Sequence, residues 1–277
     1  MTLVPHMDTL FAVYLGKFKF GEHAMDIKIV IATHKRYWLP GNPCFLPVQV
    51  GKTQEVSLGF AGDDSGDNIS ARNAVYHELT GLYWAWKNVQ ADYLGLCHYR
   101  RYFARTCWSF DLAGKQKAIL GLEDFEGLLW DCDCVLPTKR HYYIETVRSQ
   151  YEHAHHARDL AAIEKVTLTL YPEYRQALAE VMGRRSLHLW NMFVMKRPLF
   201  DAYCAFLFNI LFTLEKQMRE QEMAIEPGLF GFLSERLLDV WLTKHNIKYK
   251  EVPVMFMEKV NWFSKGWYFV KRKFGKR

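Results

Sequence analysis

The chain has 277 residues, half of them hydrophobic, which is enough for one large domain or two small ones with a buried core. Its net charge is +6, and the longest apolar run, residues 202–214, is shorter than the ~18 residues that a membrane-spanning helix needs. No secretory signal is visible, and the cysteine spacing matches neither a zinc finger nor a thioredoxin motif. These features favour a cytosolic protein with reduced thiols.

The first predicted strand, residues 25–33, is apolar and β-branched and ends at Thr33, His34 and Lys35. Polar residues after the first strand of an α/β sheet are the usual place to hold a nucleotide. Residues 1–24 show no clear periodicity and are predicted to form an N-terminal extension. We therefore expect the folded domain to span residues 25–256.

An acidic loop follows a second predicted strand at residues 56–60. Its polar side chains either contact a donor or cation, or serve as helix caps and solubilising charges; they are Asp63, Asp64, Asp67 and Asn68. A helix is predicted over residues 71–88, with one apolar stripe for the core. A neighbouring polar and aromatic stripe begins at Arg72 and either lines a cleft or forms a solvated boundary.

The most informative segment is residues 92–103, in which an apolar strand stops abruptly at a cationic and aromatic cluster. This cluster consists of His98, Tyr99, Arg100 and Arg101. Ligands of open α/β sheets bind beyond the carboxyl ends of the strands, and arginine offers bidentate donors to phosphate or carboxylate. The cluster favours an anionic ligand over the alternative of surface ion pairs.

Two further groups resemble metal sites, although each has a stronger alternative. Asp131 and Asp133 match an Asp-x-Asp pattern, but they precede an apolar strand, so we interpret the match as accidental. His153 and His156 have helical i, i+3 spacing, but zinc sites show more ligands, so substrate contacts or surface positions are favoured. We therefore assign no metal-binding residue, and Mn²⁺ or Mg²⁺ is retained only as a candidate cofactor.

Residues 188–196 are predicted to form a strand that carries Trp190 and Asn191. A buried amide needs partners, so Asn191 either ties neighbouring loops together or binds a sugar hydroxyl. Near the start of a later helix, residues 228–242, stands Glu235. A carboxylate in that place is either a general base or an ion-paired glutamate.

Further helices are predicted over residues 124–129, 144–165, 172–182 and 198–217, and further strands over 132–137 and 249–255. Strands that alternate with helices imply a single α/β domain with a mostly parallel central sheet.

The C-terminal tail, residues 257–277, is predicted to be basic and aromatic. From residue 259 onward it has seven Lys or Arg and no Asp or Glu. In a helix, its Trp and Phe side chains would lie opposite its basic ones, which favours an anionic membrane surface over nucleic acid. We expect a peripheral protein at the inner face of the cytoplasmic membrane.

Several strings of this sequence resemble one group of bacterial proteins from capsule, exopolysaccharide and O-antigen gene clusters, long labelled a domain of unknown function. The strings span residues 68–73, 78–88, 93–103, 191–196 and 231–237, and include His-Tyr-Arg-Arg-Tyr-Phe. Members are regarded as glycosyltransferases, some of them galactofuranosyltransferases. The resemblance implies the single-domain, Rossmann-like GT-A fold. It also implies a late acidic residue as base, a place that Glu235 fits.

The resulting hypothesis is an inverting transfer of a hexose from a UDP-sugar to a glycan or lipid-linked glycan acceptor. The strand-end cluster and the acidic loop hold the donor, with the arginines in place of a cation. Trp190, Asn191, His153 and His156 contact the acceptor, and Glu235 activates its hydroxyl. The alternative is a non-catalytic glycan- or nucleotide-binding scaffold of a polysaccharide-assembly complex. A nucleic-acid partner is not expected, because the core has no recognised motif for one.

Overall fold

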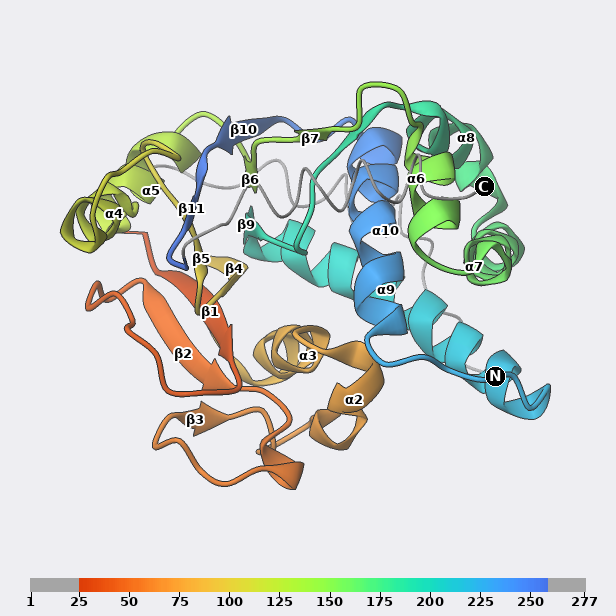
Figure 1. The fold of residues 1–277 in the computed structure, drawn as a ribbon, viewed down its shortest axis with the longest axis horizontal. Helices are drawn as coiled ribbons and strands as arrows, with labels where there is room; N and C mark the ends of the chain where they lie inside the picture. The colour runs from red at the N-terminus through yellow and green to blue at the C-terminus, as the bar shows by residue number, and fades with distance from the viewer. Residues whose placement is uncertain (1–24, 259–277) are drawn as a thin grey trace, which may run out of the picture.

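The computed structural model describes residues 25–258, so the predicted N-terminal extension and nearly all of the basic tail lie outside the described residues. A mixed sheet forms the centre of the molecule (Figure 1). Its main path is β10-β6-β9-β4-β1-β2-β3, and β5 and β11 extend it beside β4. The strands are β1 (Ile27–Thr33), β2 (Phe45–Gln49), β3 (Ala61–Gly62), β4 (Tyr93–His98), β5 (Arg101–Phe103), β6 (Cys134–Pro137), β9 (Phe193–Lys196), β10 (Tyr249–Val252) and β11 (Val254–Phe256).

The sheet is mostly parallel. Strands β1, β2, β3 and β4 pair in parallel, as do β6 and β10. Strand β9 runs antiparallel to both of its neighbours, β4 and β6, and β5 runs antiparallel to β4. The start of β9 therefore lies at the same edge of the sheet as the carboxyl ends of β1, β4 and β6.

Successive side chains of each strand enter two different hydrophobic cores, because strand side chains alternate between faces. In β1, Ile27, Ile29 and Ile31 face one core, while Val30 and Ala32 face the other. The smaller core is closed by α4 (Leu112–Ala118) and α5 (Leu122–Leu129). The larger core is closed by the remaining helices, which Figure 1 shows on the other side of the molecule.

The helices around the larger core include α2 (Asn73–Tyr76), α3 (Leu79–Asn88), α6 (Val147–Ala154), α7 (Ala157–Leu170), α8 (Arg175–Gly183), α9 (Arg197–Glu220) and α10 (Leu229–His245). Single 3₁₀ turns lie at Lys52–Gln54, Ser70–Arg72 and Pro172–Tyr174, and a short ribbon pairs β7 (Arg140–His141) with β8 (Ser186–Leu187). Within the described part of the chain, α9 is the one helix long and apolar enough to cross a membrane. It packs against α7, α3 and β4, as a core helix does.

The second strand of the sheet is not the predicted one. Residues 56–60 form no strand, and Val56 is 86% exposed. The side chain of Gln49 holds this segment instead, donating to the Val56 carbonyl and accepting from the Leu58 amide. Strand β2 lies earlier and contains Pro47, a residue that usually argues against a strand.

The helix predicted over residues 71–88 is divided at His77, whose φ is +49°. The side-chain amide of Asn73 donates to the His77 carbonyl at 2.8 Å and caps the end of α2. The strand predicted over residues 188–196 is also shorter, because Trp190 and Asn191 form a turn with φ of +71° and +52°. Both interruptions occur at the edge where the strands end.

Gly95 in β4 allows close contact with β9, and its replacement tests this packing. A Cβ atom at Gly95 would lie 2.5 Å from the Phe193 carbonyl oxygen. We expect Gly95→Ala to lower the free energy of unfolding by about 1–3 kcal/mol, because backbone cannot move aside cheaply. The measurement is urea unfolding followed by circular dichroism.

The matched control is Gly127→Ala in α5, where a new Cβ meets nothing within 4 Å. Alanine is the better helix former, so this variant should be neutral or more stable by about 0.5–1 kcal/mol. Equal stability of the two variants would contradict the proposed packing constraint.

Candidate functional site

One edge of the sheet gathers most of the residues that the sequence singled out. Lys35 follows β1, the arginine pair follows β4, and Trp190 and Asn191 precede β9. The antiparallel direction of β9 is the reason that a segment leading into a strand meets segments leaving other strands. This edge is the usual ligand-binding edge of an α/β sheet.

The ring of Tyr99 is the centre of a cationic cluster at this edge. Tyr99 is only 4% exposed, and the His34 ring meets it edge-on at 5.1 Å between centroids. The Lys35 ammonium and the Arg100 guanidinium each lie 5.3 Å from the centre of the same ring. Burial lowers the pKa of His34, and the charges of Lys35 and Arg100 lower it further. The cluster therefore concentrates positive charge on a fixed aromatic support.

Thr33 has a local structural role beneath this cluster. Its side chain is fully buried, and its hydroxyl donates to the Lys35 carbonyl at 2.7 Å. Its own carbonyl accepts from the Val50 amide. Thr33 thus shapes the turn that presents His34 and Lys35.

Glu258, which sequence reasoning missed, neutralises part of the cluster. Its carboxylate lies 3.1 Å from Arg100 Nη1 and 3.8 Å from Lys35 Nζ. The segment is held in place because the Met257 amide donates to the Arg100 carbonyl and Lys115 Nζ donates to the Phe256 carbonyl. An anion that binds Arg100 must compete with Glu258. The only sequence signal was that Glu258 is the last acidic residue before the basic tail.

Arg101 differs from Arg100 because no hydrogen bond or ion pair of its guanidinium is found within residues 25–258. Its buried Nε has no partner there. The guanidinium lies 5.8 Å from the ring centres of both Trp190 and Phe256. Glu78 and Glu235 are close enough for their charges to raise its pKa, against the stronger effects of burial and of Arg100. Arg101 is therefore a cation that aromatic rings position, and its guanidinium N–H groups have no acceptor among the described residues.

Helix α10 fixes the segment before β9 with three acidic or polar side chains, an arrangement that we call the α10 clamp. Asp239 accepts from the His188 amide at 2.9 Å, and Glu235 accepts from the Trp190 amide at 2.8 Å. Ser234 donates to the Asn191 side-chain oxygen at 2.9 Å. The clamp satisfies the buried backbone donors of a turn that is costly for residues other than glycine.

Asn191 ties this turn to the break between α2 and α3. Its amide group donates to Glu78 at 2.8 Å and to the Gly231 carbonyl at 3.1 Å. With its oxygen already accepting from Ser234, the side chain is satisfied internally. The structure therefore favours the tying role of Asn191. It also reveals Glu78, which the sequence had hidden inside an apparently continuous helix.

A hydrogen bond between His98 and Trp190 joins the end of β4 to the turn that precedes β9. His98 Nε2 lies 2.6 Å from the Trp190 carbonyl, and only a protonated nitrogen can donate to that oxygen. Burial lowers the pKa of His98, and the charges of Arg101 and Arg100 act in the same direction. A neutral His98 with its proton on Nε2 satisfies both conditions.

Opposing influences act on the pKa of Glu235. Burial raises the pKa of its carboxyl group, and the nearby charge of Glu78 raises it further. Arg236 opposes this shift and donates to Oε2 at 2.9 Å. The Glu235 side chain keeps 15% of its surface exposed.

The predicted acidic loop is held largely by internal contacts. Asp63 is fully buried, and its carboxylate accepts from the Gly51 and Lys52 amides and from the Ser70 hydroxyl. Asp67 accepts from Tyr83, and Asp64 pairs with Lys52. The side chain of Asn68 bonds within the loop, to Gly66 and Ser70. These contacts fit the alternative that the loop is a structural cap.

Arg72 is directed to α9 rather than to the strand edge. It pairs with the buried carboxylate of Glu215 at 3.0 Å, which also accepts from Tyr76 and Arg219. The side chain of His153 is 64% exposed and bonds to Glu145, and His156 is exposed at the start of α7. Among the described residues, Arg72, His153 and His156 make no contact with the cationic cluster.

Asp131 and Asp133 lie before β6, at the opposite edge of the sheet, where they pair with Lys250 and Lys196. Among residues 25–258 no group of three or more His, Cys, Asp or Glu side chains is arranged to hold a metal ion.

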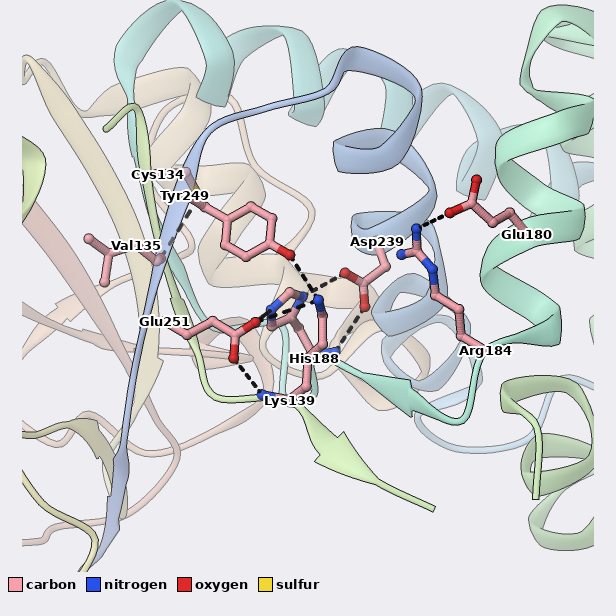
Figure 2. Close-up of polar contacts among 9 residues, drawn as sticks. All are labelled: Cys134, Val135, Lys139, Glu180, Arg184, His188, Asp239, Tyr249 and Glu251. Atoms are coloured by element: carbon pink, nitrogen blue, oxygen red, sulfur yellow. Dashed lines mark hydrogen bonds and ion pairs between the residues drawn. The ribbon is translucent and has the colours of Figure 1, made fainter. Parts of the chain in front are cut away.

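A partly buried charge network adjoins the clamp at Asp239 (Figure 2). His188 stands between two carboxylates, with Nδ1 at 2.6 Å from Asp239 and Nε2 at 3.2 Å from Glu251. Lys139 lies 3.5 Å from Glu251 and donates to Tyr249. Burial alone would lower the pKa of His188, but the two carboxylates outweigh it and raise the pKa above 6.5. Hydrogen bonding to His188 lowers the pKa of Glu251 to about 2.

The network predicts a defined pH window for its contribution to stability. The raised pKa of His188 gives stabilisation that is complete below pH 6.5 and lost as the pH rises through the raised value. The lowered pKa of Glu251 gives stabilisation that is complete above pH 4.5 and lost as the pH falls towards about 2. We expect Glu251→Gln to lower the free energy of unfolding by about 1–2 kcal/mol between these limits and by less outside them.

Urea unfolding of both proteins from pH 3 to pH 9 measures this difference. Glu123→Gln, an exposed position in α5, serves as the control and should show no such window. A Glu251→Gln effect that does not change with pH would contradict the charge pairing.

Comparisons with known proteins agree with this fold. The family described as a domain of unknown function, DUF4422, matches residues 28–246. A solved structure, the apo form of the bifunctional glycosyltransferase WbbM, superposes with a TM-score of 0.76 and 29% identity over 84% of this chain. The chain spans about half of that longer protein, 46% of its length, and no curated protein matches. The Rossmann-like α/β fold with a mostly parallel central sheet is thus confirmed, and the chain belongs to the DUF4422 family.

Proposed function

We propose that the chain is a glycosyltransferase of bacterial surface-polysaccharide synthesis, transferring a hexose from a nucleotide-sugar to a glycan acceptor. One observation carries this proposal: the strand-edge arginine with spare donors, Arg101, lies within electrostatic reach of the partly exposed carboxylate of Glu235. A cation for the leaving diphosphate and a base for the acceptor are thereby held together. The similarity to WbbM supports the same reaction class.

In the proposed reaction, the carboxylate of Glu235 accepts the proton of an acceptor hydroxyl. The hydroxyl oxygen attacks the anomeric carbon of the donor as the bond from that carbon to the diphosphate oxygen breaks. Arg100 and Arg101 stabilise the negative charge that develops on the departing diphosphate. Attack from the opposite side inverts the anomeric configuration.

The donor proposed is a UDP-hexose, with galactofuranose as the candidate sugar. His34 and Lys35 are proposed to contact the nucleotide beside the arginines, and their positions around Tyr99 support this. Trp190 is proposed to face the acceptor. The basic tail, which lies outside the described residues, is proposed to hold the protein at the inner face of the cytoplasmic membrane, where a lipid-linked acceptor would be found.

A scaffold that binds without turnover is the second candidate. Two contacts favour it: Glu258 already pairs with Arg100, and both oxygens of Glu235 have internal partners. The two functions differ in a single observable, because a scaffold binds the donor but never consumes it.

Substitution of Glu235 tests the base. Glu235→Gln keeps an oxygen that can accept from the Trp190 amide but removes the proton acceptor. We expect transfer from UDP-hexose to fall by about 10²–10⁴-fold while UDP binding changes little. Glu220→Gln, on the exposed end of α9, is the control and should retain full turnover. Unchanged turnover of Glu235→Gln would exclude the base assignment.

Two substitutions with opposite expected effects on UDP binding test the proposed diphosphate site. UDP should raise the melting temperature by mass action. We expect Arg101→Ala to reduce this rise, since a donor to phosphate is lost, and Glu258→Gln to tighten UDP binding about two- to fivefold, since a competing carboxylate is lost.

The thermal shift is measured with and without Mn²⁺, and Arg105→Ala, whose exposed side chain pairs with Asp124, is the control. Stabilisation by UDP alone supports arginines in place of a cation. A requirement for Mn²⁺ would show that a metal takes part. Equal UDP affinity in all variants would place the donor elsewhere.

A further inference from the structure

An exposed aromatic side chain lies on the same face of α10 as Glu235. Phe232 is 37% exposed, although most large apolar side chains of this helix are buried. It precedes Glu235 by three residues, and side chains at that spacing are neighbours on a helix, with Cβ atoms about 5–6 Å apart. The exposed ring therefore stands beside the carboxylate that we propose as the base.

Two imidazole rings flank Phe232. The His155 ring lies nearly parallel to it, 4.5 Å away between centroids and tilted by 32°. The His77 ring meets it edge-on at 6.3 Å. His155 in turn packs on the buried ring of Tyr151 at 4.8 Å. The three rings of Phe232, His155 and His77, which we call the aromatic platform, come from three separate parts of the chain.

The platform is rigidly connected to Glu235. Arg236 Nη1 donates both to the Phe232 carbonyl, at 2.7 Å, and to Glu235 Oε2, at 2.9 Å. Its guanidinium lies 4.9 Å from the centre of the Tyr151 ring, beneath His155. One buried arginine thus fixes the platform and the carboxylate relative to each other, as a site for two reacting groups requires.

His77 connects the platform to the donor side of the edge. Its φ of +49° directs the chain back between α2 and α3, a conformation that is costly for a residue with a Cβ atom. Gly228 leaves room for the ring, since a Cβ atom there would lie 2.3 Å from His77 Cε1. His77 is also close enough to His34 for a protonated imidazole there to lower the pKa of His34 in the cationic cluster. The platform therefore adjoins the proposed donor site.

We propose that the aromatic platform binds the acceptor sugar, with one C–H face of a hexose ring stacked on Phe232 and a hydroxyl directed to Glu235. An aromatic face with polar groups at its edges suits such a ligand, because the ring covers the apolar C–H surface while imidazoles bond to hydroxyls. Trp190 adjoins the same carboxylate, because its backbone amide donates to Glu235. This inference rests on the proposed transferase function and names the subsite for its acceptor.

Ligand-detected NMR tests the subsite without requiring turnover. The probes are methyl β-D-galactopyranoside, methyl α-D-glucopyranoside and methyl α-D-mannopyranoside, observed by saturation transfer from the full-length protein. We expect saturation of the protons on one face of a hexose in the wild type. Phe232→Ala should weaken that binding about five- to tenfold, while Phe232→Trp should retain it because a stacking surface remains.

Phe110→Ala is the matched control, since Phe110 is fully exposed beside α4, outside the site. Thermal melting of each variant establishes that the fold is kept. Binding in Phe232→Ala equal to that of the wild type would overturn the inference, as would the absence of saturation transfer to all three glycosides. Loss of binding in both Phe232→Ala and Phe232→Trp would also overturn it, because stacking would then not be the cause.

Donor binding and turnover are measured in parallel with UDP and UDP-hexose. If UDP binds and UDP-hexose is consumed, but glycoside binding is the same with and without the Phe232 side chain, the inference fails and the transferase function stands. If glycoside binding depends on Phe232 but UDP-hexose is never consumed, the platform stands as a glycan site of a scaffold and the transferase proposal fails.

Discussion

The α10 clamp is the constraint on which the rest of the site depends. Two consecutive non-glycine residues, Trp190 and Asn191, adopt positive φ, and α10 side chains stabilise the resulting turn by accepting from the Trp190 amide and donating to the Asn191 side-chain oxygen. The turn sets the Trp190 carbonyl against His98 and the Asn191 amide against Glu78. One helix face thus orients segments that come from three separate parts of the chain.

Glu235 has a structural role in the clamp and a proposed role as the base, and both roles involve the same carboxylate oxygens. As part of the clamp it accepts from a backbone amide and an arginine, which favours the ionised form. As a buried carboxylate near Glu78 it is nevertheless pushed to a raised pKa. A carboxylate that is oriented by its structural bonds and made more basic by burial suits the proposed role of base, because it needs little rearrangement to accept a proton.

The cationic cluster, our proposed anion site, is stabilised by contacts within the protein. Clustered cations repel one another, and here a buried tyrosine ring and the carboxylate of Glu258 offset the repulsion around Lys35 and Arg100. Arg101 has no such carboxylate partner within residues 25–258 and relies on the rings of Trp190 and Phe256. Of the two arginines, Arg101 is therefore the more available for phosphate.

The sequence by itself determined the α/β class, the mostly parallel sheet and the strand-end cluster, because apolar runs that stop at polar residues report local burial directly. It also located Glu235 near a helix start. It misplaced the second strand and hid Glu78 and His77 inside a continuous helix, since the break is held by side-chain contacts from Asn73 and from the distant Asn191 and not by a glycine or proline. Only the tertiary structure decided that Asp63 and Arg72 have internal partners and that Phe232 is exposed between His155 and His77. The physical reason is that periodicity records which side of an element is buried, whereas the partners of a polar side chain depend on where the other elements pack.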